Sequence, residues 1–152
     1  MAMEANEAPP PALDERHCRY RLRVGPSPVH GWGVFAQEAI PSGLQVIEYT
    51  GEWVRQLEWR RYVDRPILYL FEYDDEWMVD GGAGGSGAEH INHSCDPNLV
   101  IRKLERHLLL FSIRAIAVNE ELSLDYRISP DTKHMICHCG SPRCRGFLNR
   151  AS

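Results

Sequence analysis

The sequence lacks the features of several common protein classes. No apolar run approaches the roughly 20 residues that a membrane-spanning helix needs, so we expect no membrane partner. The opening residues, MAMEANEAPPPALDER, have neither the basic start nor the apolar stretch of a secretory signal peptide. No Gly-x-Gly-x-x-Gly run lies between an expected strand and an expected helix, which argues against a Rossmann nucleotide site. These absences predict a soluble intracellular protein.

The chain also lacks an excess of positive charge. Lys and Arg together number 17 against 21 Asp and Glu, for a net charge of −4 and a pI near 6.0. Proteins that bind a phosphate backbone are usually basic, so direct nucleic-acid binding is not expected. The acidic balance is compatible with a basic partner, such as a lysine-rich peptide. The length of 152 residues suits one domain with a modest core.

Cysteine is scarce but unevenly distributed. Five cysteines without a secretory signal fit poorly with a disulfide framework. Three of them lie close together in the run CHCGSPRC; they are Cys137, Cys139 and Cys144. Zinc prefers four thiolate or imidazole ligands at tetrahedral corners, so this run supplies three of the four. The fourth is His138 or comes from elsewhere, with Cys95 favoured because Cys18 falls in an expected strand near the N-terminus. The alternative is a loop of free thiols.

The hydrophobic pattern is typical of a mostly β protein. Short runs of alternating or apolar residues recur between turns that contain Gly, Pro or charged residues. The expected strands are 19–25, 32–36, 44–49, 67–73, 76–80, 98–104, 107–113 and 121–126. The two strands on either side of Glu105 and Arg106 are expected to form a hairpin. One short helix is predicted over 55–63, and 81–87 is predicted to be a flexible glycine-rich loop.

Three further motifs are ambiguous when each is taken alone. In HGWGVF, Trp32 is either a core aromatic residue or one wall of a ligand cradle that the flanking glycines open. In LSLDY, the strand-end Tyr126 is either structural or a hydrogen-bonding group of an active site. In INHSCDPN, His93 and Cys95 could form a base and nucleophile, bind a metal or belong to a turn.

The order of the motifs is more specific than any single motif. The runs HGWGVF, EYTGE, INHSCDPN, NEELSLDY and CHCGSPRCRGFLN follow one another along the chain. In this order they closely resemble SET-domain protein-lysine methyltransferases with a zinc-binding post-SET tail, in the manner of a small stand-alone member without a pre-SET region. The resemblance implies a mostly β SET fold of several small sheets with a short helix and a knot-like C-terminal threading. It implies a SET domain over 18–130 and a post-SET tail over 131–152. The acidic, proline-rich composition of residues 1–17 predicts a disordered lead-in.

The resemblance also implies roles for individual residues. The residues implied to bind the methyl donor, S-adenosylmethionine (SAM), are His30, Gly31, Trp32, Tyr69, Asn92 and His93. The lysine channel is implied to be lined by Tyr49, Phe71 and Leu124, with Tyr126 as the catalytic tyrosine. The ligands implied for a structural Zn²⁺ are Cys95, Cys137, Cys139 and Cys144.

The function implied by the resemblance is SAM-dependent methylation of a lysine side-chain amine, on a histone tail or another basic protein. The implied location is the nucleus in a eukaryote and the cytoplasm in a bacterium. One competing hypothesis is a non-catalytic SET-like module that binds peptides. It is favoured by Glu89 and His90, which stand where the family usually has an arginine followed by an aromatic residue. A second is a purely structural zinc module, which leaves the order of the other motifs unexplained.

Overall fold

Short strands make up most of the fold. The computed structural model of the protein describes residues 9–62 and 69–151. The strands in these ranges are β1 Leu22–Pro26, β2 Trp32–Ala36, β3 Gln45–Tyr49, β4 Glu52–Arg55, β5 Leu70–Glu72, β6 Trp77–Asp80, β7 Asn92–His93, β8 Leu99–Leu104, β9 His107–Ser112 and β10 Ser123–Leu124. The helices described are short 3-10 helices: η1 Glu15–His17, η2 Gln56–Arg61 and η3 Ala88–His90.

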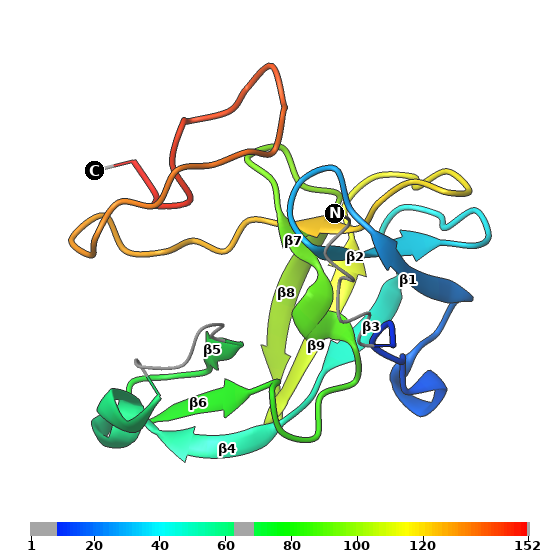
Figure 1. Ribbon diagram of the computed structural model, residues 1–152. Helices are drawn as coiled ribbons and strands as arrows, with labels where there is room; N and C mark the ends of the chain where they lie inside the picture. Colours follow the sequence, from blue (N-terminus) through cyan, green and yellow to red (C-terminus); the bar gives the residue numbers. More distant parts are fainter. Residues whose placement is uncertain (1–8, 63–68, 152) are drawn as a thin grey trace, which may run out of the picture.

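The strands form three sheets (Figure 1). β1 pairs with β2, a three-stranded sheet has the order β4-β6-β5, and the central sheet has the order β3-β9-β8-β10-β7. In the central sheet β10 runs parallel to both β7 and β8, and its pairing with β7 aligns Leu124 with His93. The prediction of a mostly β fold with several small sheets is therefore confirmed. The knot-like threading of the C-terminal segment stays a prediction.

The N-terminal segment is ordered closer to its start than the sequence suggested. Residues 1–8 of the expected disordered lead-in lie outside the described residues, but residues 9–17 are placed. The backbone N–H of Asp14 donates to the carbonyl of Ser86 (2.8 Å), and the Asp14 side chain caps η1. Leu13 packs against the hydrophobic core. An apolar side chain and a buried backbone contact thus fix a stretch whose composition alone looked disordered.

The helix expected over 55–63 is the 3-10 helix η2, which ends at Arg61, and residue 63 lies outside the described residues. Its apolar side chains find no core to pack against, since Leu57 is 91% exposed and Trp59 is 46% exposed. Most helical stability in proteins comes from packing of an apolar face, so this segment remains a single short element. None of the helices in the described ranges has the length and hydropathy of a bilayer-crossing segment.

The β8–β9 hairpin turns at Glu105 and Arg106, as predicted. Their φ angles are 48° and 65°, and positive φ at both central residues is the pattern of a type I′ turn, whose twist matches that of paired strands. The turn reaches the β4-β6-β5 sheet, where the Arg106 backbone N–H donates to the Tyr73 hydroxyl (2.9 Å). The hairpin therefore supports the small sheet from one side.

The Arg106 guanidinium also lies over two indole rings. Its Cζ is 4.2 Å from the centroid of Trp53 and 5.5 Å from that of Trp77. We expect Arg106→Ala to lower the free energy of unfolding by about 1 kcal/mol through loss of this cation–π contact, which corresponds to a Tm lower by roughly 2–4 °C in a chain of this size. Thermal and denaturant unfolding measure both quantities. Glu105→Ala, in the same turn and also at positive φ, is the matched control. An equal loss in the two variants would assign the effect to the turn.

The hydrophobic core is formed mainly by β2, β3, β8, β9 and β10. The segment Asn92–Cys95 (NHSC) lies at its border. The largest side chains that are fully buried in it are Ile40, Ile47, Leu99, Leu108, Leu110, Ile116 and Leu122. Asn92 and His93, although polar, are buried as well. Buried polar groups require hydrogen-bond partners, so their partners define what this part of the molecule does.

Candidate active site and metal centre

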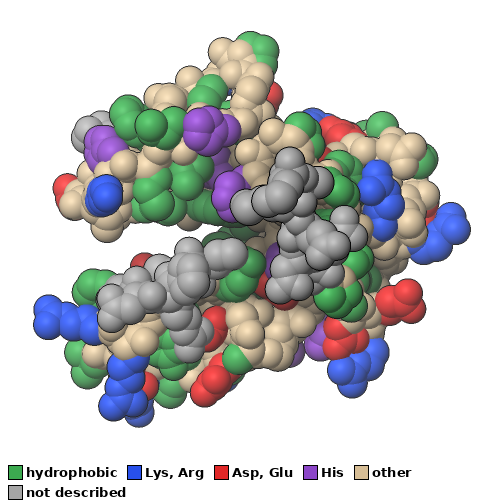
Figure 2. All heavy atoms as spheres, viewed as in Figure 1, with side chains coloured by type: hydrophobic (Ala, Val, Ile, Leu, Met, Phe, Trp, Pro, Cys, Tyr) green, Lys and Arg blue, Asp and Glu red, His purple; other side chains and the backbone are tan. Residues whose placement is uncertain are grey.

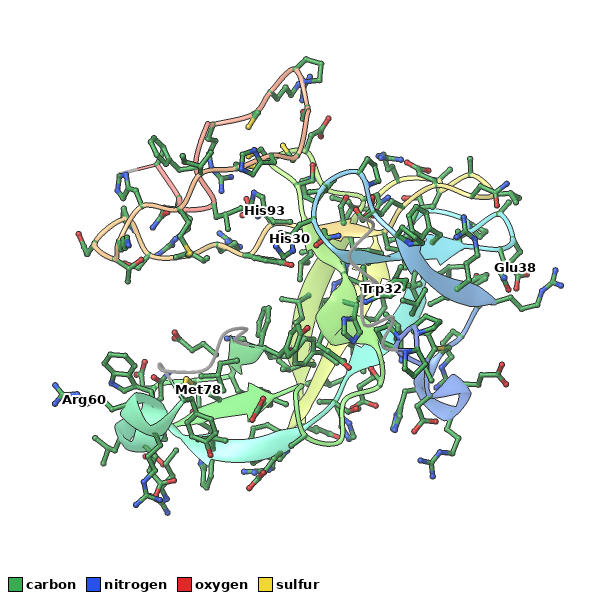
Figure 3. All side chains as sticks on the ribbon, viewed as in Figure 1. His30, Trp32, Glu38, Arg60, Met78 and His93 are labelled. Atoms are coloured by element: carbon green, nitrogen blue, oxygen red, sulfur yellow. The ribbon has the colours of Figure 1, made fainter. Side chains whose placement is uncertain are left out.

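A cleft separates the C-terminal segment from the β4-β6-β5 sheet. Figure 2 shows it as a deep hollow between two lobes, with hydrophobic side chains along its walls. In Figure 1 the same view assigns the upper lobe to the C-terminal segment and the lower lobe to β4, β5, β6 and η2. Figure 3 places His30 and His93 at the inner end of the cleft, whereas Met78 and Arg60 belong to the opposite lobe. Described residues of both lobes therefore border the cleft.

Asn92 ties β7 to the loop before β2. Its Nδ2 donates to the carbonyl oxygens of His30 (3.0 Å) and Trp32 (2.9 Å) and to Glu121 Oε1 (3.0 Å). Between them Gly31 has a φ of +46°, a conformation that glycine adopts without strain. The first and second stretches predicted to bind SAM are therefore one surface, held together by a single buried amide.

His93 connects the same strand to Tyr126 and to a cysteine. Its Nδ1 accepts the backbone N–H of Tyr126 (3.1 Å), so the proton of the neutral ring is on Nε2. Nε2 lies 3.4 Å from Cys95 Sγ, and the ring packs edge-on against that of Tyr126 with centroids 5.3 Å apart. Burial lowers the pKa of His93, which favours this neutral form.

Tyr126 is held at the inner end of the cleft. Its hydroxyl donates to the carbonyl of Ile91 (2.6 Å), the residue before the predicted SAM-binding pair. Burial raises the pKa of Tyr126, so the hydroxyl keeps its proton at physiological pH. A neutral phenol can donate one hydrogen bond and accept others, which makes it a group that orients a small polar substrate atom.

The residues predicted to line a lysine channel come from separate strands and meet. The rings of Tyr49 and Phe71 have centroids 5.5 Å apart, and the Tyr49 hydroxyl donates to the carbonyl of Tyr69. Burial also raises the pKa of Tyr49, with the nearby Tyr126 contributing to the shift. Leu124 is buried in the same apolar cluster. Tyr49 and Phe71 therefore form one aromatic region, while the ring of Tyr69 packs edge-on against that of His90 with centroids 5.4 Å apart.

The four cysteines predicted to bind zinc converge from distant parts of the chain. Their sulfur atoms all lie within 4.8 Å of one another, and within the described ranges no other such group of metal-binding side chains occurs. Cys95 Sγ is 3.7 Å from Cys137 Sγ and 4.0 Å from Cys144 Sγ. Zn–S bonds of about 2.3 Å at tetrahedral angles place sulfurs about 3.8 Å apart, so the four thiols can hold a zinc ion. His138 is exposed and outside this group, which leaves Cys95 as the fourth donor.

The backbone prepares these sulfurs for a metal. Cys137, Cys95 and Cys144 Sγ accept the backbone N–H groups of Cys139, Arg145 and Gly146, respectively. Although burial raises it, hydrogen bonds from the backbone N–H groups of Cys95 and Ser141 lower the pKa of the Cys139 thiol to about 6. A thiolate is the form that binds metal, and Cys139 favours it, whereas burial raises the pKa of the Cys95 and Cys137 thiols.

Charged residues that the motifs did not single out complete the site. Glu121 Oε1 accepts both Asn92 Nδ2 and the Ser27 hydroxyl (2.7 Å), and Arg145 forms a two-point ion pair with Asp125. The only signal of these residues in the sequence is position, since each lies within the motif NEELSLDY or CHCGSPRCRGFLN. Their partners lie far along the chain and could not be read from the sequence.

Glu89, one of the departures from the family pattern, is a buried carboxyl next to the aromatic region. Its side chain is 9% exposed, and its Oε2 accepts the Gly87 N–H (2.9 Å). A Cβ on Gly81 would come within 2.8 Å of Glu89 Cβ and 2.7 Å of the Tyr49 hydroxyl, so glycine is needed for this packing. Burial raises the pKa of Glu89 because the charged form loses water.

We expect Glu89→Gln to reduce the pH dependence of stability. A carboxyl with a higher pKa in the folded state than in the unfolded state binds protons more readily when folded. Its contribution to stability is therefore greatest at acid pH and falls as the pH rises above the ordinary value of 4.5. Gln carries no charge and can still accept the Gly87 N–H. Thermal unfolding of both proteins across this range should show wild type losing stability relative to the variant as the pH rises. A constant difference in Tm would contradict the assignment.

Comparison with known proteins identifies the arrangement. The sequence model of the SET domain matches residues 31–127. The chain is similar to the histone-lysine N-methyltransferase TRX1 of Oryza sativa subsp. japonica, with 39% identity over 142 residues, 86% of this chain and 14% of that protein. It is similar to the H3 lysine-4 specific histone-lysine N-methyltransferase of Saccharomyces cerevisiae, with 36% identity over 136 residues, 81% of this chain and 13% of that protein. The chain thus spans a small part of the length of these relatives.

Solved structures show the same fold. A crystal structure of KRYPTONITE in complex with mCHG DNA and SAH has a TM-score of 0.75 and 33% identity, covering 89% of this chain and 30% of that chain. A second, in complex with mCHH DNA, an H3(1-15) peptide and SAH, has a TM-score of 0.73 and 33% identity, covering 89% of this chain and 31% of that chain.

Proposed function

Because the chain belongs to the SET-domain family, we propose that it transfers methyl groups from SAM to the side-chain amine of a lysine in a histone or another basic protein. The printed names of the relatives are those of histone-lysine methyltransferases, and KRYPTONITE is bound to SAH, the product that SAM leaves after methyl transfer. The observation that carries the proposal is the position of the Tyr126 hydroxyl, between the Asn92–His93 strand and the aromatic region of Tyr49 and Phe71.

The chemistry requires a neutral amine held in line with the methyl group. Bound SAM would supply an electrophilic methyl on a sulfonium. A free lysine has a pKa of about 10.4 and is an ammonium ion at neutral pH. A channel walled by Tyr49, Phe71 and Tyr126 removes water from around the charged form and so favours the neutral amine. The Tyr126 hydroxyl then orients the amine, and alignment of this kind can contribute on the order of 7–11 kcal/mol at best.

The remaining site residues would hold the two ligands. The loop of His30, Gly31 and Trp32, fixed by Asn92, is proposed to bind SAM together with His93 and Tyr69. The four cysteines are proposed to hold a structural Zn²⁺, because a shell of four thiolates leaves no open position for catalysis. The zinc would fix the C-terminal segment as one wall of the cleft. In a eukaryotic cell the proposed substrate places the protein in the nucleus.

A non-catalytic peptide-binding module is the competing function, favoured by Glu89 in place of the usual arginine. Calorimetric titration of the zinc-loaded protein with SAM separates the two. We expect saturable binding that Asn92→Ala weakens, because this variant releases the loop of residues 30–32. Asn6→Ala, in the N-terminal stretch outside the site motifs, is the control variant. Absence of SAM binding by a folded, zinc-loaded protein would contradict the enzymatic proposal.

A further inference from the structure

The C-terminal segment contacts the Asp125–Tyr126 dipeptide by two separate routes. One is ionic and runs through Arg145. The other runs through the metal centre, from Cys95 Sγ to His93 Nε2 and from His93 Nδ1 to the backbone N–H of Tyr126. Both routes begin in or beside the cysteine cluster and end at the same peptide unit, which carries the proposed catalytic tyrosine.

The ionic route is geometrically specific. Arg145 Nη1 donates to Asp125 Oδ2 (2.8 Å) and Nη2 donates to Oδ1 (3.2 Å), the two-point arrangement that fixes both planes. Two of the other three guanidinium N–H groups are used within the C-terminal segment, where Nε donates to the Asn149 carbonyl (3.1 Å) and Nη2 to the Leu148 carbonyl (2.9 Å). The side chain is therefore held in place by its own segment. A movement of that segment would also move the guanidinium that binds Asp125.

Asp125 in turn controls the backbone on the far side of Tyr126. Its Oδ1 accepts the backbone N–H of Arg127 (2.9 Å), a residue with a φ of +53°. A residue with a side chain is strained in this left-handed conformation, so the turn needs support from other residues. The Asp125 carboxylate supplies that support while it is held by Arg145. Tyr126 thus has His93 at its N–H and an Asp125-stabilised turn directly after it.

We propose that Arg145 is a positioning residue that makes the placement of Tyr126 depend on the docking of the C-terminal segment. The inference rests on the proposed function and names a residue that the motifs left without a role. Arg145 also donates its backbone N–H to Cys95 Sγ (3.4 Å), so the residue belongs to both routes. The position of Tyr126 therefore depends on whether the C-terminal segment is docked, and a bound zinc ion would hold that segment in its docked position.

The test compares Arg145→Gln with Arg143→Gln, an exposed arginine two positions earlier whose guanidinium is assigned no role. Zinc content, SAM affinity, kcat, KM for a histone peptide and amide exchange over residues 124–127 are measured for each variant. We expect Arg145→Gln to keep its zinc, its SAM affinity and its KM, to lower kcat about tenfold, which is about 1.4 kcal/mol, and to speed exchange over 124–127. Arg145→Lys should restore part of kcat, since it keeps the charge. Arg143→Gln should match wild type.

Asp125→Asn tests the other partner of the ion pair, alone and combined with Arg145→Gln. If the pair acts as a unit, the double variant with Arg145→Gln loses no more kcat than either single variant. Equal kcat and equal exchange in Arg145→Gln and Arg143→Gln would overturn the proposal, and so would loss of zinc from Arg145→Gln, because the role would then be structural. A wild-type protein that transfers no methyl group would refute the proposed function instead. The exchange comparison would still decide whether Arg145 positions Tyr126.

Discussion

Tyr126→Phe is expected to lower kcat by about 10²-fold or more, while zinc content and SAM affinity stay at wild-type values. The Tyr126 hydroxyl lies beside the predicted cofactor strand, where it donates to the Ile91 carbonyl, and its ring packs against His93. Phenylalanine keeps the ring that packs against His93 at 5.3 Å, so the shape of the site is preserved. What is lost is the group that orients the amine.

The cost of this substitution to folding is smaller than its expected effect on catalysis. The hydroxyl donates to the Ile91 carbonyl, and loss of such a bond typically costs about 1 kcal/mol of stability. Tyr20→Phe, at a partly buried position outside the site, is the control and should leave kcat unchanged. Steady-state kinetics with thermal unfolding of all three proteins decides the matter. A folded Tyr126→Phe with wild-type kcat would remove Tyr126 from the mechanism.

Cys137→Ser is expected to remove the zinc and with it most of the activity. Cys137 is the most buried of the four sulfur donors, and its backbone N–H donates to the Gly146 carbonyl (2.9 Å) within the C-terminal segment. A serine hydroxyl is a poor replacement for a thiolate, and structural zinc contributes an apparent binding free energy of about 10–16 kcal/mol in small zinc domains. Without the ion, four sulfurs within 4.8 Å no longer tie residues 137–144 to Cys95. The C-terminal segment, which forms one wall of the cleft, is then no longer fixed in place.

The matched control for this variant is Cys18→Ser. Cys18 lies outside the cluster, where its thiol donates to the Asp14 carbonyl (3.5 Å). We expect full zinc content in Cys18→Ser and a zinc content near zero in Cys137→Ser, measured by atomic emission on dialysed protein. Circular dichroism should show that the central sheet survives in both. Retention of zinc by Cys137→Ser would mean that another side chain replaces the thiolate and that the ligand set is wrong.

Local chemistry explains what the sequence could predict. Alternating apolar residues placed most of the strands and the β8–β9 turn, because strand periodicity is a property of a few consecutive residues. The short strands β4 and β7 were not among those expected. The cysteine run predicted three metal donors for the same reason. Cys95 could be favoured as the fourth only by comparing the few remaining candidates. The order of the motifs then predicted the family, and residues 31–127 match its sequence model.

Interactions between distant residues explain what the sequence could not predict. The pairing of Arg145 with Asp125 spans 20 positions and that of Asn92 with the carbonyl of His30 spans 62, and a single sequence holds no record of either. Leu13 and Asp14 are ordered by contacts with the core and with Ser86, although proline and acidic residues around them suggested disorder. The segment of η2 has helical spacing, but Leu57 and Trp59 are exposed instead of packed in the core, so the short length of the helix depends on tertiary packing.

The most direct test of the account is methyl transfer from labelled SAM to core histones and to a cell lysate by zinc-loaded wild type, with Tyr126→Phe alongside. The account predicts label on lysine side chains with wild type and almost none with the variant. No label from a folded, zinc-loaded wild type that binds SAM would contradict it and would favour a module that binds peptides without modifying them.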